Sequence, residues 1–497
     1  MNNLKKYYLY ILILKYVGDD VMQLKIKKNE IQQEATGLRK GCLSFVQVLA
    51  QSVANVGPSV GPALGIPVVF AASGNGTWLI YVFVTITMLL VAYNINQFTK
   101  RSASPGSLYT YISGVMGPKV GVIAGWGLIL AYIMTGAACL AGFSNYASML
   151  LGLLGIKVPI AIVALIGGLS VLYIALRDVK LSAKLMLLFE IISTLLILTL
   201  FIIILVKKGS VLDYTQLKLT GVSFGGLKNG LVIAFFAYTG FESAAALGGE
   251  AKNPLKTIPK VLTVCLLIVG FLFTIFSYIE IAGFQGLSTK LGDAGAPISI
   301  LANSNGIPIM GLLINIGAAI SFWSCMVAVV TASARVIFYM SFHKILPCTF
   351  KAVHKKYGTP YKSIIAASTL LISIPIILLI LGGSTFSIFN WLGTIATYGF
   401  LVCYTLCVIS SPIYLYRNHF LKARNVVISV ITIAILLFPI VGSIYPVPEY
   451  PMNLLPLIFL AWLLAGGIYF INKFKKNPEI PKNIRGELNS LKGKFQI

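Results

Sequence analysis

The sequence predicts an all-α polytopic membrane protein with twelve transmembrane helices, and its composition is the first reason. Of its 497 residues, 57% are hydrophobic and only 11% are charged, whereas an average protein carries roughly 25% charged residues. The stretches 41–99, 294–334 and 363–416 contain no Asp, Glu, Lys or Arg. A bilayer tolerates such stretches as helices of roughly 20 residues, because each backbone polar group must be satisfied internally. A β-barrel would instead show alternating segments of about ten residues.

Turn signals and charged loops separate the individual spans. The first uncharged stretch is too long for one helix and divides at Ser73-Gly74-Asn75-Gly76, a typical turn sequence. The last uncharged stretch divides in the same way at Gly382-Gly383-Ser384. We expect spans at 43–72, 77–98, 120–151, 158–176, 184–206, 228–250, 261–284, 307–341, 363–382, 386–415, 425–445 and 453–472.

The basic residues predict the orientation of these spans. With both termini inside, the inner segments hold 33 of the 39 Lys and Arg residues and the outer loops hold 6. Because basic residues concentrate on the cytoplasmic side, we expect a multi-pass protein of the cytoplasmic membrane with the N-terminus and C-terminus inside. The net charge of +25 then reflects cytoplasmic loops rather than a nucleic-acid partner.

The domain organisation follows from the spans. We expect a cytoplasmic leader at 1–40, a first five-helix unit at 41–226, a second at 227–416, two further spans within 417–472 and a basic cytoplasmic tail at 473–497. Within the leader, Tyr7 to Leu14 is apolar but too short to span, and no small-residue cleavage site follows it. We therefore hypothesise that translation starts at Met22.

Residues suited to enzyme or metal chemistry are absent from the predicted membrane depth. His343, His354 and His419 all fall in predicted inner loops, so no intramembrane hydrolase site can form. Most cysteines lie in apolar runs without a CxxC motif, as buried hydrophobic residues do. We expect no enzyme, no metal centre and no cofactor.

The first span carries an interruption signal. Its sequence from Gly57 to Pro62 contains two prolines and two glycines, and proline removes a helix hydrogen bond and clashes with the preceding turn. Local unwinding is one interpretation. The other is close helix packing, because Gly57, Gly61 and Gly65 form a GxxxGxxxG face.

The sixth span carries a second signal, a glycine and a carboxylate within Phe236-Ala237-Tyr238-Thr239-Gly240-Phe241-Glu242. An ionisable residue at this depth costs a few kcal/mol and by default marks a functional path; a neutral Glu capping a backbone amide is the alternative.

The two signals begin successive five-helix units. Inverted-repeat transporters place discontinuous helices in this way, with the substrate between them. Half-helix N-termini suit a carboxylate and half-helix C-termini suit an ammonium group, so a zwitterionic amino acid would satisfy both.

The span-six sequence, followed by Glu250-Ala251-Lys252-Asn253-Pro254 and Ile258-Pro259, resembles a signature of the amino acid–polyamine–organocation (APC) superfamily, in its amino acid permease branch. The segment from Ser104 to Tyr111 is similar to the inner loop of that family after span two, and Arg335 with Leu346-Pro347 fits the end of span eight. The resemblance implies the leucine-transporter type fold, a 5+5 inverted repeat with two peripheral helices. It also implies a substrate groove formed by the backbone of Val56, Gly57, Pro58, Ser59, Tyr238, Thr239, Gly240 and Phe241.

The resemblance leaves the coupling ion open. Many family members carry a lysine in span five, and counting from Lys180 places Ser193 at that position. Ser193, Ser321 and Ser324 could form an oxygen site for Na⁺, or they could simply bond to helix carbonyls. Alternatively, Glu242 carries a proton, because desolvation favours its neutral form. We assign no role to Glu190.

The function that we expect is secondary active transport of amino acids by alternating access, as ion-coupled symport. An amino acid or amine exchanger and a polyamine or ethanolamine permease are alternatives within the same class. A transporter-like nutrient sensor is less favoured, because the polar C-terminal tail is short. The expected partners are a small-molecule substrate and the lipid bilayer.

Overall fold

The computed structural model describes residues 41–484, except for residues 105, 178, 443, 444, 446, 448 and 483, and it leaves the side chains of 179–183 undescribed. The predictions for the leader at 1–40, including a start at Met22, and for the tail beyond 484 concern residues outside this part.

The described part of the chain is helical and has no β-strand, in agreement with the predicted all-α class. Its first half comprises α2 (Phe45–Val56), η1 (Gly61–Gly65), α3 (Ile66–Ser73), η2 (Gly74–Gly76), α4 (Thr77–Thr99), α5 (Ser107–Met116), α6 (Pro118–Leu153), α7 (Ile160–Leu176) and α8 (Val179–Lys208). The second half comprises α9 (Tyr214–Leu217), α10 (Phe224–Tyr238), η3 (Phe241–Leu247), α11 (Pro254–Phe284), η4 (Leu291–Asp293), α12 (Pro297–Ser304), α13 (Pro308–Phe342), η5 (Cys348–Lys351), α14 (Tyr361–Ile380), α15 (Thr385–Arg417), α16 (Ala423–Gly442), η6 (Met452–Leu454) and α17 (Leu455–Lys476).

Among the described residues, ten helical stretches are long and apolar enough to cross a membrane. The first of them, Phe45–Thr99, contains the first two expected spans, because the predicted turn at Gly74–Gly76 is itself a short 3-10 helix. The fourth expected span forms α7, which is not among these ten; its 17 residues are at the lower end of the length range for a span.

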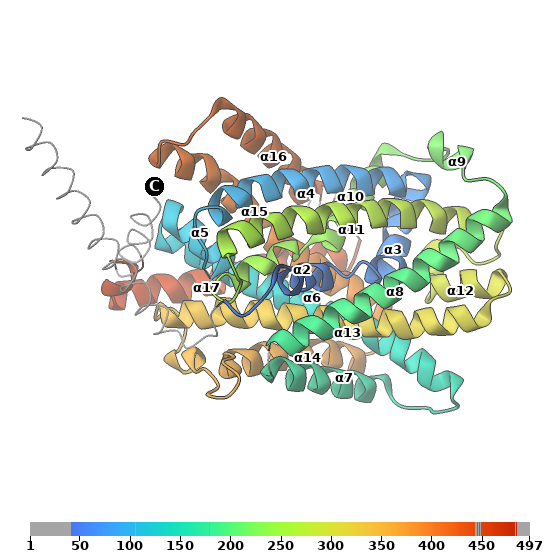
Figure 1. The fold of residues 1–497 in the computed structure, drawn as a ribbon, viewed down its shortest axis with the longest axis horizontal. Coiled ribbons are helices and arrows are strands. Elements are labelled where there is room, and N and C mark those ends of the chain that lie inside the picture. Colours follow the sequence, from blue (N-terminus) through green and yellow to red (C-terminus); the bar gives the residue numbers. More distant parts are fainter. Residues whose placement is uncertain are drawn as a thin grey trace, which may run out of the picture.

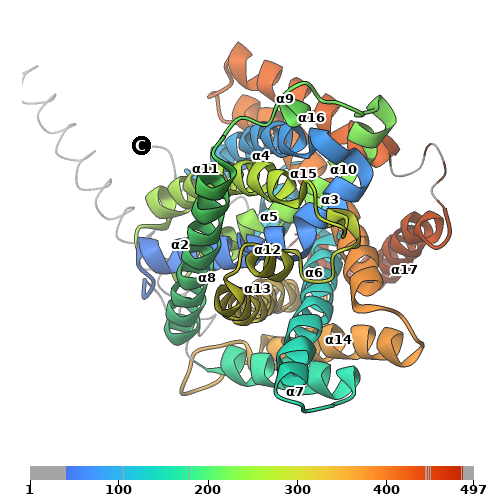
Figure 2. The same cartoon turned by 90° about the vertical axis from the view of Figure 1, so that its right-hand side faces the viewer.

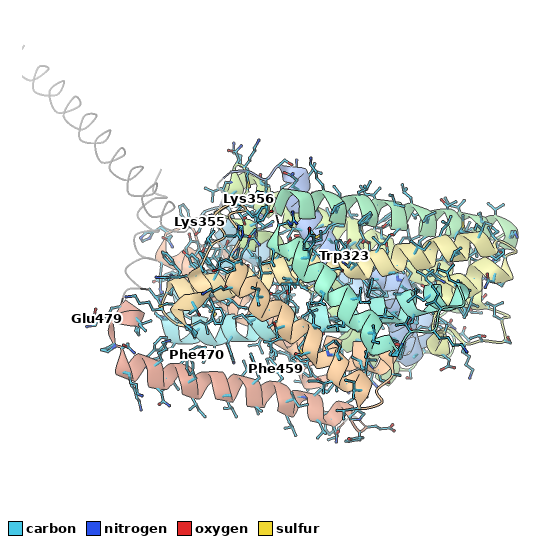
Figure 3. All side chains as sticks on the ribbon, turned by 90° about the horizontal axis from the view of Figure 1, so that it is seen from below. Trp323, Lys355, Lys356, Phe459, Phe470 and Glu479 are labelled. Atoms are coloured by element: carbon cyan, nitrogen blue, oxygen red, sulfur yellow. The ribbon has the colours of Figure 1, made fainter. Side chains whose placement is uncertain are left out.

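The long helices run side by side in one bundle (Figure 1). Seen along the bundle, α16 and α17 lie at its periphery (Figure 2). Phe459 and Phe470 of α17 point toward the rest of the bundle (Figure 3) and are buried. Trp126 of α6 stacks on Trp462 of α17 with ring centroids 4.2 Å apart. Large apolar side chains on the outer faces, such as Phe271, are exposed as a lipid-facing surface requires.

The first membrane helix is interrupted where its glycines and prolines predict. α2 ends at Val56, and Gly57 adopts a left-handed conformation (φ +65°) that glycine tolerates without strain. A π-helical turn, η1, follows before α3 resumes. Close packing also occurs here, because a Cβ at Gly61 would lie 2.3 Å from the Phe273 ring. Both interpretations of the sequence therefore apply to this segment.

The sixth expected span is interrupted in the same way. α10 ends at Tyr238, Thr239 is extended, and Gly240 is left-handed with φ +88°. The chain then continues as the 3-10 helix η3 rather than as an α-helix. The two breaks are neighbours in space, since η3 packs against α2.

Candidate functional site

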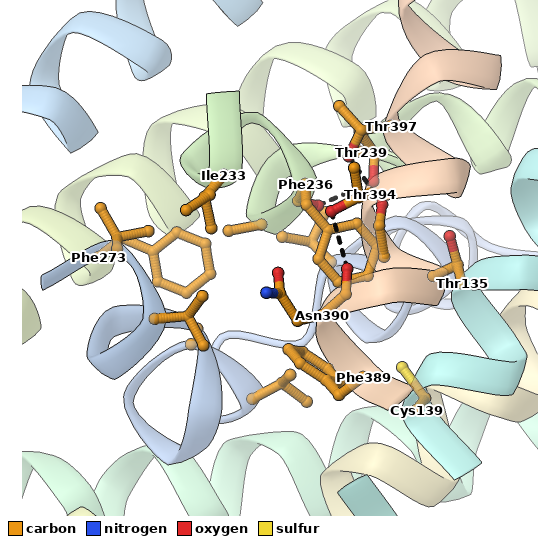
Figure 4. Close-up of a pocket in the computed structure, with 18 of the residues that line it drawn as sticks. Thr135, Cys139, Ile233, Phe236, Thr239, Phe273, Phe389, Asn390, Thr394 and Thr397 are labelled. Atoms are coloured by element: carbon orange, nitrogen blue, oxygen red, sulfur yellow. Dashed lines mark hydrogen bonds between the residues drawn. The ribbon is translucent and has the colours of Figure 1, made fainter. Parts of the chain in front are cut away.

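A cavity lies beside the two helix breaks (Figure 4). The empty space within it is ≈ 710 Å³ when its open mouth is included. Residues of both interrupted helices line it, together with residues of α4, α6, α11, α13 and α15. Its polar lining residues are all uncharged: Asn55, Tyr81, Thr135, Thr239, Asn390, Thr394 and Thr397.

The threonines at the cavity mostly satisfy their own helices. Thr239, Thr394 and Thr397 each donate to a backbone carbonyl three or four residues earlier, at 2.8–2.9 Å (Figure 4). Asn390 points from α15 into the cavity (Figure 4). The amide side chains are therefore the groups best placed to bond a ligand.

Asn55 is the residue of this site that the sequence analysis missed. Its side chain is 2% exposed, and neither its amide nitrogen nor its amide oxygen has a hydrogen-bond partner among the described residues. It lies in the last turn of α2 against Gly240 of the other break. Buried polar groups are normally bonded, so this amide is a strong candidate for a ligand contact. The available signal was an amide side chain immediately before the Gly-Pro interruption.

The eight residues predicted for the substrate groove do not all face the cavity. Val56 and Thr239 line it. Ser59 instead bonds Glu190. Tyr238 turns its hydroxyl toward Thr85 and the carbonyl of Tyr81. The remaining four, which the cavity lining does not include, are Gly57, Pro58, Gly240 and Phe241.

Glu242 lies behind the second break and is completely buried. One carboxylate oxygen accepts a hydrogen bond from Tyr132 of α6 at 2.8 Å, and the other accepts one from Tyr404 of α15. The hydroxyl of Tyr404 in turn accepts the backbone N–H of Gly240 at 3.3 Å. Glu242 therefore connects the second break to two further helices.

Glu190 forms the corresponding cluster behind the first break. One of its oxygens accepts the backbone N–H and the hydroxyl of Ser59 at 2.8 and 3.0 Å, and the other accepts the Ser321 hydroxyl at 2.6 Å. Thr194 lies 3.4 Å from the Ser59 hydroxyl. From the sequence we assigned Glu190 no role, although a carboxylate within an apolar span by default marks a functional site.

The three serines predicted for a sodium site are placed differently from one another. Ser321 joins the Glu190 cluster, whereas Ser193 donates to the carbonyl of Gly317 at 2.9 Å. Ser324 is buried, and its hydroxyl has no partner among the described residues. Glu190, one turn before Ser193, is thus the span-five residue that reaches the first break. No group of three or more metal-binding side chains occurs in the described part of the chain.

A buried ion pair ties together segments at the far end of η3. Arg335 of α13 bonds both carboxylate oxygens of Glu250 at 2.5 and 2.8 Å, and both side chains are 2% exposed. Next to it, Leu43 and Ala251 form an isolated parallel bridge. The start of the first membrane helix is thereby joined to the chain that follows the second break.

Two interrupted membrane helices facing one cavity are typical of secondary transporters, which bind their substrates at such breaks. The family model for amino acid permeases matches residues 47–484. The chain therefore belongs to the amino acid permease family, which confirms the resemblance to the APC superfamily and the prediction of a membrane permease rather than an enzyme.

Curated relatives are similar to this chain at low identity. The branched-chain amino acid permease BcaP of Bacillus subtilis is 26% identical over 313 residues, which cover 58% of this chain and 64% of that protein. The methylthioribose transporter of the same organism is 26% identical, with 59% and 66% covered. The serine/threonine exchanger SteT of B. subtilis is 28% identical, with 67% and 75% covered. The chain thus matches slightly less than two thirds of the first two relatives' length.

Proposed function

We propose that this protein is a secondary transporter of neutral amino acids, and the uncharged lining of the cavity between the helix breaks is the observation that carries this proposal. A substrate with a net charge would need a compensating charge nearby, because an unpaired charge is costly away from water. A zwitterion has no net charge, so the partial charges of helix ends and an amide can match it.

The breaks and Asn55 would hold the two ends of the zwitterion. The C-terminal ends of α2 and α10 offer carbonyl groups to the ammonium end. Val60 and Gly61, at the start of η1, line the cavity wall, but their N–H groups already donate to the carbonyl of Gly57 at 2.8 and 3.4 Å. The amide nitrogen of Asn55, which has no partner among the described residues, is the donor that remains for the carboxylate. Asn55 can donate to one end and accept from the other. The backbone N–H of Ser59, a residue of the predicted substrate groove, already donates to Glu190, so we place the carboxylate near Asn55.

The rest of the lining favours an apolar or small side chain on the substrate. Val68, Val69, Phe236 and Phe389 are among its apolar lining residues. Relatives named as a branched-chain amino acid permease and a serine/threonine exchanger support this class. A polyamine or ethanolamine permease would need a carboxylate in the cavity wall, and among the described lining residues there is none.

The architecture that fits this function is twelve spans in a 5+5 inverted repeat with two peripheral helices. Each proposed five-helix unit begins with an interrupted span, and α16 and α17 lie at the periphery of the bundle (Figure 2). Alternating access would open the cavity to one side at a time. The basic loops favour a cytoplasmic membrane location with both termini inside.

Ion coupling has two candidate sites. Glu242 could bind a proton, as the sequence predicts. The Glu190 cluster supplies carboxylate and hydroxyl oxygens from Ser59, Thr194 and Ser321, which are ligands that hard cations such as Na⁺ prefer. Ser193 and Ser324 would stand outside this set.

Uptake of a labelled amino acid panel into proteoliposomes tests the proposal. We expect neutral amino acids to accumulate when a proton or sodium gradient is imposed, and decarboxylated analogues to compete poorly. Equal competition by a decarboxylated amine would favour the polyamine or ethanolamine function. If the protein exchanges substrate in counterflow but accumulates none under any gradient, an exchanger is favoured. If it binds substrate saturably but shows neither uptake nor counterflow, a sensor is favoured.

A further inference from the structure

Glu190, Glu242 and Glu280 are carboxyl groups buried within membrane-length helices, with exposures of 2%, 0% and 0%. Their hydrogen bonds separate them. Glu190 accepts three hydrogen bonds and Glu242 accepts two from phenols. Neither oxygen of Glu280 has a partner among the described residues.

The position of Glu280 connects it to the cavity wall. It lies in α11, seven residues and therefore about two turns beyond Phe273, which lines the cavity from the same helix. The phenols of Tyr81 and Tyr146 lie near its carboxyl group. Tyr81 also lines the cavity and leaves its own hydroxyl without a partner, and Tyr146 donates to the carbonyl of Ala63 in η1 at 2.8 Å.

The charged groups around this end of α11 do not neutralise Glu280. The Lys208 ammonium group of α8 bonds the carbonyl of Ala282 and the side chain of Gln285 instead. Asp213 accepts bonds from Thr215 and Gln216. The buried Arg335 is paired with Glu250, at the other end of the bundle, and is therefore not a counter-charge for Glu280.

Glu280 must therefore be neutral in this conformation. A carboxylate without donors or a counter-charge costs several kcal/mol away from water, and a bound proton removes that cost. Hydrogen-bond donors stabilise the charged form of a carboxyl group. Glu190 and Glu242 have such donors, whereas Glu280 has none among the described residues.

We propose that Glu280 is a proton-binding site of the transport cycle, in addition to the coupling sites considered above. The proton adds to the carboxylate as an O–H bond when the wall formed by η1 and Tyr81 closes over it. It returns to water when that wall moves and the carboxylate becomes hydrated. This inference rests on the proposed transport function, because only a moving cavity wall exposes Glu280 to water.

Infrared spectroscopy tests the bound proton without requiring transport. At neutral pH we expect a protonated-carboxyl absorption with a component that is lost in Glu280→Gln. That component should remain in Glu242→Gln and Glu190→Gln, whatever part of the band those two carboxyl groups contribute themselves. Retention of the full absorption in Glu280→Gln, or its absence from the wild type, overturns the proposal. If Glu280→Gln does not fold, Glu280→Leu serves the same test.

Counterflow of a neutral amino acid at varied external pH supplies the functional test. We expect Glu280→Gln to lose the dependence of the rate on external pH while it still exchanges substrate. An unchanged pH dependence in this variant overturns the role in the cycle. If the wild type neither accumulates nor exchanges any amino acid, the proposed function fails instead, and the infrared result still decides whether Glu280 holds a proton.

Discussion

A Cβ atom added at Gly240 would lie 2.6 Å from Oδ1 of Asn55, so the two interrupted helices meet at these two residues. One residue has no side chain and a positive φ, and the other has a buried amide without a partner. The absence of a side chain at Gly240 thus makes room for the amide at the end of α2.

Replacement of Gly240 by leucine should abolish transport and leave the protein in the membrane. The side chain would collide with Asn55, and the left-handed backbone at φ +88° disfavours any L-residue with a Cβ. Uptake and membrane content of the variant are the measurements. Gly467→Leu is the control, because a Cβ there meets nothing within 4 Å. Normal uptake by Gly240→Leu would remove the second break from the site.

Replacement of Asn55 by alanine should raise the KM for a neutral amino acid. Loss of a hydrogen bond to a charged group costs about 1.5–3 kcal/mol, which corresponds to about a 10- to 150-fold change in KM. Initial uptake rates across substrate concentrations give the KM. Asn75→Ala is the control, because that amide, in the turn between the first two spans and away from the cavity lining, donates to the Thr220 carbonyl. An unchanged KM for Asn55→Ala would exclude this amide from substrate binding.

Glu242→Gln should lose concentrative uptake driven by a pH gradient, because a proton carrier must change its charge during the cycle. Counterflow should survive, since the amide resembles the protonated acid in shape and can still accept the Tyr132 hydroxyl. Tyr404→Phe is the matched control, because it removes one phenol donor and keeps the carboxyl group. Accumulation by Glu242→Gln under a pH gradient alone would show that Glu242 is not the carrier.

Sodium coupling, if it operates, should depend on the Glu190 cluster. Glu190→Gln and Ser321→Ala should then raise the sodium concentration needed for half-maximal uptake, because both remove oxygen ligands behind the first break. Ser193→Ala should have little effect, since that hydroxyl is bonded to the Gly317 carbonyl. Ser321 is shared with the three-serine site predicted from the sequence, so Ser193, Ser324 and Glu190 separate the two sites. Damage by Ser193→Ala and Ser324→Ala, with none by Glu190→Gln, would favour the three-serine site. If wild-type uptake does not respond to sodium, Na⁺ is excluded as the coupling ion.

Arg335→Ala should destabilise the protein by about 3–5 kcal/mol, because it leaves Glu250 as a buried charge without its partner. Denaturant unfolding of the purified protein in detergent measures this change. Paired replacement of Arg335 and Glu250 by methionine should cost less, since no charge stays buried. Arg424→Ala is the control, because Arg424 lies near the Tyr93 ring and is not part of this ion pair. If Arg335→Ala is as stable as this control, the ion pair contributes little to stability.

The sequence by itself determined the helical class, the approximate spans and the two interruptions. These features depend on local chemistry: apolar runs need a helix in lipid, and Gly57 and Gly240 permit backbone conformations that other residues disfavour. The family signature around Gly240 and Glu242 also lies within one continuous segment, so the sequence alone reveals it.

Only the tertiary structure decided which side chains meet behind those interruptions. Counting along span five pointed to Ser193, but helix rotation brings Glu190 to Ser59 and Ser321, each 131 residues away in the sequence. Tyr132 and Tyr404 reach Glu242 from 110 and 162 residues away. Residues one turn apart can both face a neighbouring helix, so the sequence of one helix does not show which of them bonds that neighbour. The packing of several helices decides this. It also leaves the side chains of Asn55 and Glu280 without a hydrogen-bond partner among the described residues.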